Sequence, residues 1–126
     1  MYYKSKYHNT KITRNGITFD SRKEADFYST LLYREKANEV CDIERQVTFE
    51  LIPNQYETEI IELKSGKTKE RKKLVERAIK YIVDFIYFDK LLNQKVYVDV
   101  KGLRTKDYII KRKLMLYMTG IKIEEM

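Results

Sequence analysis

The chain has 126 residues, which is enough for one domain around a single hydrophobic core and too few for two. Its net charge of +7 favours a polyanionic partner. No apolar run approaches the ~20 residues that a transmembrane helix needs, and Met1–Lys4 lacks an apolar signal region. We therefore expect no membrane association and a cytoplasmic location.

The cysteine and histidine content excludes several kinds of site. Cys41 is the only cysteine, so an internal disulfide is impossible, which fits a reducing cytoplasm. His8 is the only histidine, and no second cysteine or histidine stands at zinc-ligand spacing. A zinc centre and a thiol–imidazole nucleophile are both poorly supported.

The N-terminal third predicts a short arm followed by a helix. Residues 1–20 form the arm, with a hairpin turn at Asn15-Gly16. The helix is expected from Ser21 to Glu39, because Ser21 is a good N-cap and Ser21-x-x-Glu24 matches a capping box.

Glu24 has two possible roles in this helix. It can serve the capping box, or it can point inward, because it lies on the apolar stripe that contains Phe27, Tyr28, Leu31 and Leu32. One side chain cannot do both at once.

The middle of the chain predicts a strand and then a basic hairpin. The strand runs from about 43 to 51 and stops near Pro53, with Gln46 on the face opposite Val47. Residues 56–63 and 74–81 are expected to pair around a turn at Ser65-Gly66.

Two further strands, at 78–89 and 95–101, carry an unusual set of charges. If 90–94 is their loop, residue 88 pairs with 95 and Asp84 pairs with Asp99. Alternation then puts Asp84, Asp99 and Lys101 on one face of the sheet. Such a cluster can hold a divalent cation and orient a water molecule.

The alternative is a solvated face or a simple ion pair. The neighbours of Asp84 on its own face argue against that alternative, because Ile82, Ile86 and Phe88 are apolar. A carboxylate in an apolar row is costly unless it is paired or binds a metal.

The C-terminal part predicts a helix from Thr105 to Met118, with Thr105 as N-cap and Gly120 as its stop. Its apolar stripe is expected to contain Ile110, Leu114 and Tyr117, with Met118 beside it. A short strand at 121–123 would close the chain. The whole predicts a mixed α/β (α+β) fold with α-β-β-β-α-β order.

The order Glu24, Asp84, Asp99-x-Lys101 resembles the signature of the PD-(D/E)XK nucleases, which have the restriction-endonuclease-like fold. The proline that often precedes the first acid is replaced by Val83. The resemblance implies that Glu24, Asp84, Asp99 and the Val100 carbonyl bind Mg²⁺, with Mn²⁺ as a substitute. It also implies that Lys101 holds the attacking water or a phosphoryl oxygen. Gln46 would reach the active site, although a solvent-facing strand glutamine explains it equally well.

A closer resemblance covers nearly the whole chain. It is similar to short phage and prophage proteins of uncharacterised function, and to the endonuclease subunit of heteromeric bacterial transposases. The residues that carry it are Lys6-Tyr7-His8-Asn9, Gly16–Ala25, Tyr81–Phe85 and Val98–Gly102. Residues 54–77 match no motif of either group.

The basic residues cluster in three blocks, at 4–14, 64–73 and 101–113. Such blocks suit a phosphate backbone, although solubility alone explains many of them. The expected DNA contacts are Lys67, Lys69, Arg71, Lys72, Lys73, Arg104, Lys106, Lys111 and Lys113.

The leading hypothesis is a Mg²⁺-dependent DNA endonuclease of phage origin, acting on branched DNA in recombination or packaging. A single site cuts one strand, so a double-strand cut requires a homodimer or a partner protein. The alternatives are an accessory nucleic-acid-binding module that keeps the nuclease fold, and a basic protein-interaction module.

Overall fold

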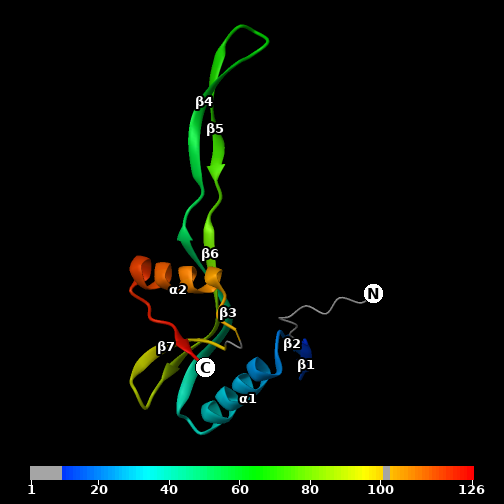
Figure 1. Ribbon diagram of the computed structural model, residues 1–126, viewed down its shortest axis with the longest axis vertical. Helices are drawn as coiled ribbons and strands as arrows, with labels where there is room; N and C mark the ends of the chain where they lie inside the picture. The colour runs from blue at the N-terminus through cyan, green and yellow to red at the C-terminus, as the bar shows by residue number, and fades with distance from the viewer. Residues whose placement is uncertain (1–9, 101–102) are drawn as a thin grey trace.

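The computed structural model describes residues 10–100 and 103–126, and it shows a small mixed α+β body from which one long hairpin projects (Figure 1). Lys101 and the basic residues of 1–9 lie outside this part of the chain. The elements are, in order, β1 (Ile12–Arg14), β2 (Ile17–Phe19), α1 (Arg22–Lys36), β3 (Val40–Ile52), β4 (Gln55–Glu62), β5 (Thr68–Glu76), β6 (Ile79–Asp89), β7 (Gln94–Asp99), α2 (Lys106–Thr119) and β8 (Glu124–Glu125).

The main sheet has the strand order β3-β6-β7-β8. Its first three strands are antiparallel, whereas β8 runs parallel to β7. Phe88 pairs with Lys95, and the same register pairs Phe85 with Val98, as the sequence predicted. When the two-stranded hairpins β1–β2 and β4–β5 are set aside, the order of the remaining elements is α-β-β-β-α-β. The predicted order and the mixed α+β class are therefore confirmed.

The two helices cover opposite faces of this sheet. Ala25 and Leu31 of α1 pack in one buried cluster with Phe85, and Tyr108 and Met115 of α2 pack in a second with Ile86. Phe85 and Ile86 are adjacent on β6, and adjacent residues of a strand point to opposite faces. The sheet is therefore the middle of three layers.

The paired strands β3 and β6 both change face at the level of Gln46 and Asp84. Val83 packs in the α2 cluster and Phe85 in the α1 cluster, although residues two apart on a regular strand share a face. On β3, Ile43 packs on the α1 side and Val47 on the α2 side. Gln46, between them, has a φ of 52°, in the left-handed region that non-glycine residues rarely adopt. This irregularity lets the β3–β6 ribbon contribute to both cores.

Helix α1 begins as predicted, because the Ser21 Oγ accepts a hydrogen bond of 3.1 Å from the Glu24 amide. It ends at Lys36 and not at Glu39, since Asn38 turns into the left-handed region with a φ of 62°. Asparagine adopts this conformation more readily than most residues. The early stop lets β3 start at Val40 and reach 13 residues.

Helix α2 begins after Thr105 and is capped by Gly120 at a φ of 74°, as expected. Of the predicted apolar stripe of this helix, only Leu114 packs against the buried cluster on the α2 side. Ile110, Tyr117 and Met118 are exposed, and the buried side chains are Tyr108 and Met115. Arg112 lies on the buried side, where it pairs with Glu125 at 2.6 Å, and a basic residue there made that face look polar. The last strand also lies at Glu124–Glu125, beyond the expected 121–123.

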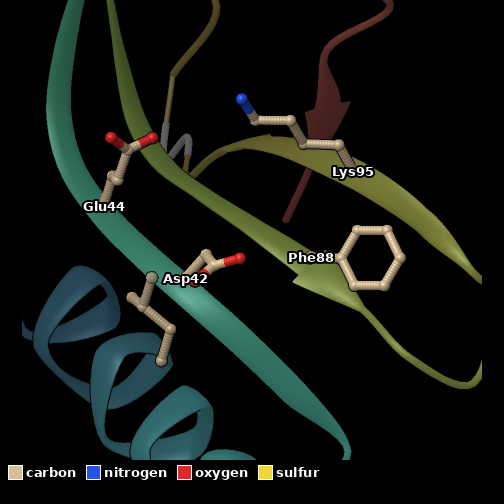
Figure 2. Close-up of a pocket in the computed structure, with 5 residues that line it drawn as sticks. Asp42, Glu44, Phe88 and Lys95 are labelled. Atoms are coloured by element: carbon tan, nitrogen blue, oxygen red, sulfur yellow. The ribbon is translucent and has the colours of Figure 1, made fainter.

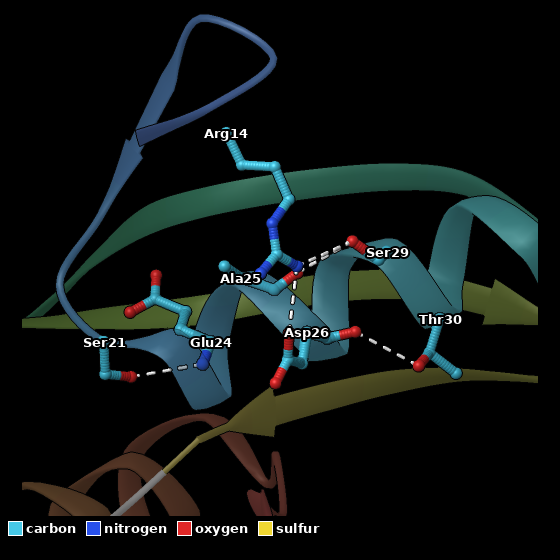
Figure 3. A network of polar contacts seen from close by, with 7 residues as sticks. All are labelled: Arg14, Ser21, Glu24, Ala25, Asp26, Ser29 and Thr30. Carbon is cyan, nitrogen blue, oxygen red and sulfur yellow. Dashed lines mark hydrogen bonds and ion pairs between the residues drawn. The ribbon is translucent and has the colours of Figure 1, made fainter. Parts of the chain in front are cut away.

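The described part of the N-terminal arm, from residue 10, is a hairpin docked on the body. Asn15 and Gly16 have φ values of 52° and 78°, as a two-residue type I′ turn requires. Phe19 is buried in the α1 cluster. Arg14 reaches α1, where it pairs with Asp26 at 2.9 Å (Figure 3).

The second hairpin, β4–β5, extends away from the body (Figure 1). Its strands pair only with each other among the described residues, from Gln55–Glu76 at the base to Glu62–Thr68 next to the turn. The predicted hairpin around Ser65-Gly66 is confirmed, but its second strand is 68–76 and not 74–81. Every residue of β5 is exposed. We call residues 55–76 the projecting hairpin.

Candidate functional site

Glu24 points into the body from the first turn of α1. Its backbone amide donates to the Ser21 hydroxyl at the start of the helix (Figure 3). Its carboxylate accepts a hydrogen bond from Gln46, so the inward role applies to the side chain. Only 4 % of the residue is exposed. The pKa of the Glu24 carboxyl is raised to about 7, first by burial and then by the nearby Asp84 and Asp20 carboxylates, while Arg45 and the Gln46 hydrogen bond oppose the shift.

Gln46 joins two acids that come from different elements. Its Nε2 donates to Glu24 Oε1 at 3.0 Å and to Asp84 Oδ1 at 3.2 Å. An amide NH₂ group has two hydrogens to donate, so one side chain can serve both carboxylates. Gln46 is exposed and Asp84 is half-buried, which leaves this side of the pair open to solvent.

Asp84 and Asp99 hold each other through backbone amides. The Asp84 amide donates to Asp99 Oδ1 at 3.0 Å, and the Val100 amide donates to Asp84 Oδ2 at 3.0 Å. The Tyr81 hydroxyl donates to Asp99 Oδ2. Asp99 is completely buried, and both of its carboxylate oxygens have a donor. We call Glu24, Gln46, Asp84 and Asp99 the carboxylate site.

Two sets of hydrogen bonds therefore bring the predicted acids together. Glu24 and Asp84 share the Gln46 amide, and Asp99 is attached to Asp84 through the backbone of the adjacent strand. Lys101, the remaining predicted residue, lies outside the described part of the chain. Within residues 10–100 and 103–126, no group of three or more acidic, histidine or cysteine side chains has the spacing to hold a metal ion.

The donor set nevertheless fits a hard cation in its chemistry. Glu24 and Asp84 supply carboxylate oxygens, which Mg²⁺ prefers over nitrogen or sulfur. The pKa of Glu24 is raised by burial and, next, by repulsion from Asp84, and a bound divalent cation would relieve that repulsion. Asp99 would join the set only after giving up the bond from Tyr81 or from the Asp84 amide.

Arg45 and Tyr81 were missed by the sequence analysis. The Arg45 guanidinium lies 4.6 Å from the centre of the Phe19 ring and acts electrostatically on Glu24. Regular alternation would put Arg45 and Gln46 on opposite faces, but the left-handed backbone at Gln46 lets both contact the α1 side. Tyr81 carried no signal in the sequence, because residues three apart on a regular strand point to opposite faces, and its contact with Asp99 follows from the change of face on β6.

The predicted DNA contacts fall on two surfaces. One is β5 with the adjoining turn, where Arg71 pairs with Glu59 across the hairpin. The other is α2 and the segment before it, where Arg104 pairs with Glu125 at 2.5 Å and Lys106 and Lys113 are exposed.

A cavity of about 480 Å³ lies on another part of β3 and is lined by Asp42, Ile43, Glu44, Phe88 and Lys95 (Figure 2). It is open to solvent and shares no residue with the carboxylate site.

None of the described helices is long and apolar enough to cross a membrane.

Comparison with known families places the chain in one of them. A family model described as "Protein of unknown function (DUF1064)" matches residues 4–123. The chain belongs to the DUF1064 family. No curated protein and no solved structure matches it. The DUF1064 match covers every residue of the carboxylate site as well as the projecting hairpin.

Proposed function

We propose that this DUF1064 protein is a Mg²⁺-dependent DNA endonuclease with a restriction-endonuclease-like core. The observation that carries the proposal is the Gln46 amide, which holds Glu24 of α1 and Asp84 of β6 side by side on an open surface. Acids from a helix and from adjacent strands of a mixed sheet are the parts that the PD-(D/E)XK resemblance requires.

The chain's own residues have separate tasks in this proposal. Glu24 and Asp84 would hold the ion, with Asp99 and the Val100 carbonyl as further ligands. Bound Mg²⁺ would neutralise charge on the phosphate and lower the pKa of a water molecule. Gln46 keeps the two acids together despite their repulsion, and Lys101 would position the water or a phosphoryl oxygen.

The expected substrate is the DNA backbone and not a base sequence. The basic side chains on α2, Lys106, Lys111 and Lys113, would contact phosphates, and phosphate contacts carry little sequence information. We propose branched DNA of phage recombination or packaging as the substrate class.

A panel of labelled DNAs tests the proposal. Single strand, duplex, flap, fork and four-way junction are incubated with the protein in Mg²⁺, Mn²⁺ or EDTA. We expect metal-dependent cutting that Asp84→Ala abolishes while DNA binding persists. Lys106→Ala is the matched control, since it removes a phosphate contact and should weaken binding without abolishing cutting. Full cutting by Asp84→Ala would remove this residue from the mechanism.

A second function is favoured by Asp99. Both of its oxygens accept hydrogen bonds in a fully buried position, as expected of a carboxylate that holds strands together. A DNA-binding accessory module that has kept the fold would look like this. It predicts no cutting with either metal, and DNA binding that survives EDTA.

A further inference from the structure

The projecting hairpin is the part of the protein that the proposed chemistry does not use. A two-stranded hairpin is marginally stable by itself, and both outer edges of this one lack a neighbouring strand among the described residues. It still exposes large apolar side chains, with Tyr56 at 53 %, Ile60 at 71 % and Leu74 at 42 %. Exposed apolar side chains of this kind commonly mark a surface that binds a partner.

Charge indicates what kind of partner this is. Residues 55–76 contain six basic residues and five glutamates, a net charge of +1, whereas the whole chain carries +7. The basic strand β5 lies beside an acidic strand β4, and the register places Glu57 opposite Lys73 and Glu59 opposite Arg71. Much of the hairpin's basic charge is thus balanced within the hairpin, which favours a protein partner over DNA.

The two faces of the hairpin differ. Residues directly opposite each other in an antiparallel pair share a face. One face carries the Glu57–Lys73, Glu59–Arg71 and Ile61–Lys69 pairs. The other face carries the pairs Tyr56–Leu74, Thr58–Lys72 and Ile60–Glu70, with Glu62–Thr68 next to the turn. We call this second set the apolar face.

The apolar face is complementary to itself. Glu70 and Lys72 stand two residues apart on β5, and both lie on this face. When a two-fold axis brings two such faces together near Arg71, each Glu70 meets the Lys72 of the other copy. The same arrangement buries Ile60 of both copies close to the axis. Opposite charges at the border of an apolar contact fix its register.

We propose that the projecting hairpin is a dimerisation element whose apolar face packs on the same face of a second copy of this chain. The proposal goes beyond the nuclease and does not rest on it, since it needs neither DNA nor metal. It also assigns Lys72 to a contact with a protein, whereas the sequence analysis predicted a contact with a DNA phosphate.

Charge exchange across the two-fold axis gives a sharp test. In Glu70→Lys both groups of each pair become lysines, and in Lys72→Glu both become glutamates. Each variant alone should therefore be monomeric, and an equimolar mixture of the two should form a heterodimer. Mass is measured by sedimentation velocity over a micromolar range without DNA or metal, where the wild type should reach twice the 15.3 kDa of one chain.

Two apolar variants complete the design. Ile60→Glu should be monomeric, while Leu91→Glu should leave the dimer intact, because Leu91 is equally exposed at 70 % but lies in the turn between β6 and β7. A monomeric wild type would overturn the proposal, as would a dimer that survives Ile60→Glu or a mixture that fails to associate. A monomer whose DNA binding is lost in Ile60→Glu would assign the face to nucleic acid instead.

Discussion

The strands of the body's sheet and those of the projecting hairpin differ in how far their side chains are buried. On β6, Val83, Phe85 and Ile86 are almost completely buried, and they pack against helices on both faces. On β5, no residue is buried. The body therefore derives its stability from packing that also fixes the carboxylate site, whereas the hairpin keeps its side chains available for contacts outside the chain.

The largest expected effect comes from the body's core. Phe85→Ala should lower the free energy of unfolding by about 3–5 kcal/mol, because it empties a fully buried ring position beside Phe27 and Tyr28. Ile60→Ala in the hairpin should change it by less than about 0.5 kcal/mol. Urea denaturation followed by circular dichroism, at a concentration below that of any association, measures both. Comparable losses would erase the distinction between the two regions.

Asp99 should rank next. Asp99→Ala leaves the Tyr81 hydroxyl and the Asp84 amide without their acceptor in a buried place, and each such group costs about 1–3 kcal/mol. Tyr81→Phe removes only one of the two bonds and should cost less. Equal stability of Asp99→Ala and the wild type would show that this carboxylate does not hold the strands, and would weaken the accessory-module reading.

Glu24 predicts a pH dependence confined to the body. Because its pKa in the folded chain is raised to about 7 from 4.5, the folded state keeps a proton that the unfolded state releases. Stability should therefore fall as pH rises from about 4.5 to 7, by about 3 kcal/mol in total. Outside that window Glu24 should contribute no pH dependence. Thermal unfolding in EDTA at several pH values measures it.

The control for this pH dependence is Glu24→Gln, which should remove that slope. Ile60→Glu in the hairpin should leave the slope from Glu24 unchanged. Mg²⁺ should flatten the slope in the wild type, because a bound cation favours the ionised carboxylate. A slope that persists in Glu24→Gln would assign the titration to another group.

The smallest effect concerns the backbone at Gln46. Gln46→Gly should change the free energy of unfolding by no more than about 1 kcal/mol, because the strain relieved at a φ of 52° is offset by the loss of the hydrogen bonds to Glu24 and Asp84. It should lower cleavage, because the bridge between Glu24 and Asp84 is lost. Asp42→Gly is the matched control, with a φ of 54° on the same strand, and it should gain stability without losing cleavage.

The sequence was most informative where a local rule operates. Ser21 and Thr105 accept the expected capping bonds, and the strand lengths around the 90–94 loop predicted the pairing of Phe88 with Lys95. These features depend on neighbouring residues alone. The proximity of Asp84 and Asp99 followed from that register, and the inward position of Glu24 followed from the apolar stripe of its helix together with the resemblance.

The sequence was uninformative where tertiary packing decides. No pattern signals a left-handed glutamine inside a strand, so the change of face at Gln46 could not be foreseen. The stripe of α2 was misjudged because Arg112 turns inward to Glu125 and lies over the Tyr108 ring. The amphipathic pattern assumes that charge faces solvent, and the partly buried Arg112–Glu125 ion pair violates that assumption.

Deleting the projecting hairpin tests most directly whether the catalytic site is complete within the body. Residues 55–76 are replaced by a two-residue Asn-Gly turn that joins β3 to β6, and nicking of supercoiled DNA is measured in Mg²⁺ and in EDTA. We expect the shortened chain to fold, to nick one strand in Mg²⁺ only, and to lose this activity in Asp84→Ala. A folded, shortened chain that binds DNA and never nicks it, alongside an active wild type, would contradict a catalytic site complete within the body.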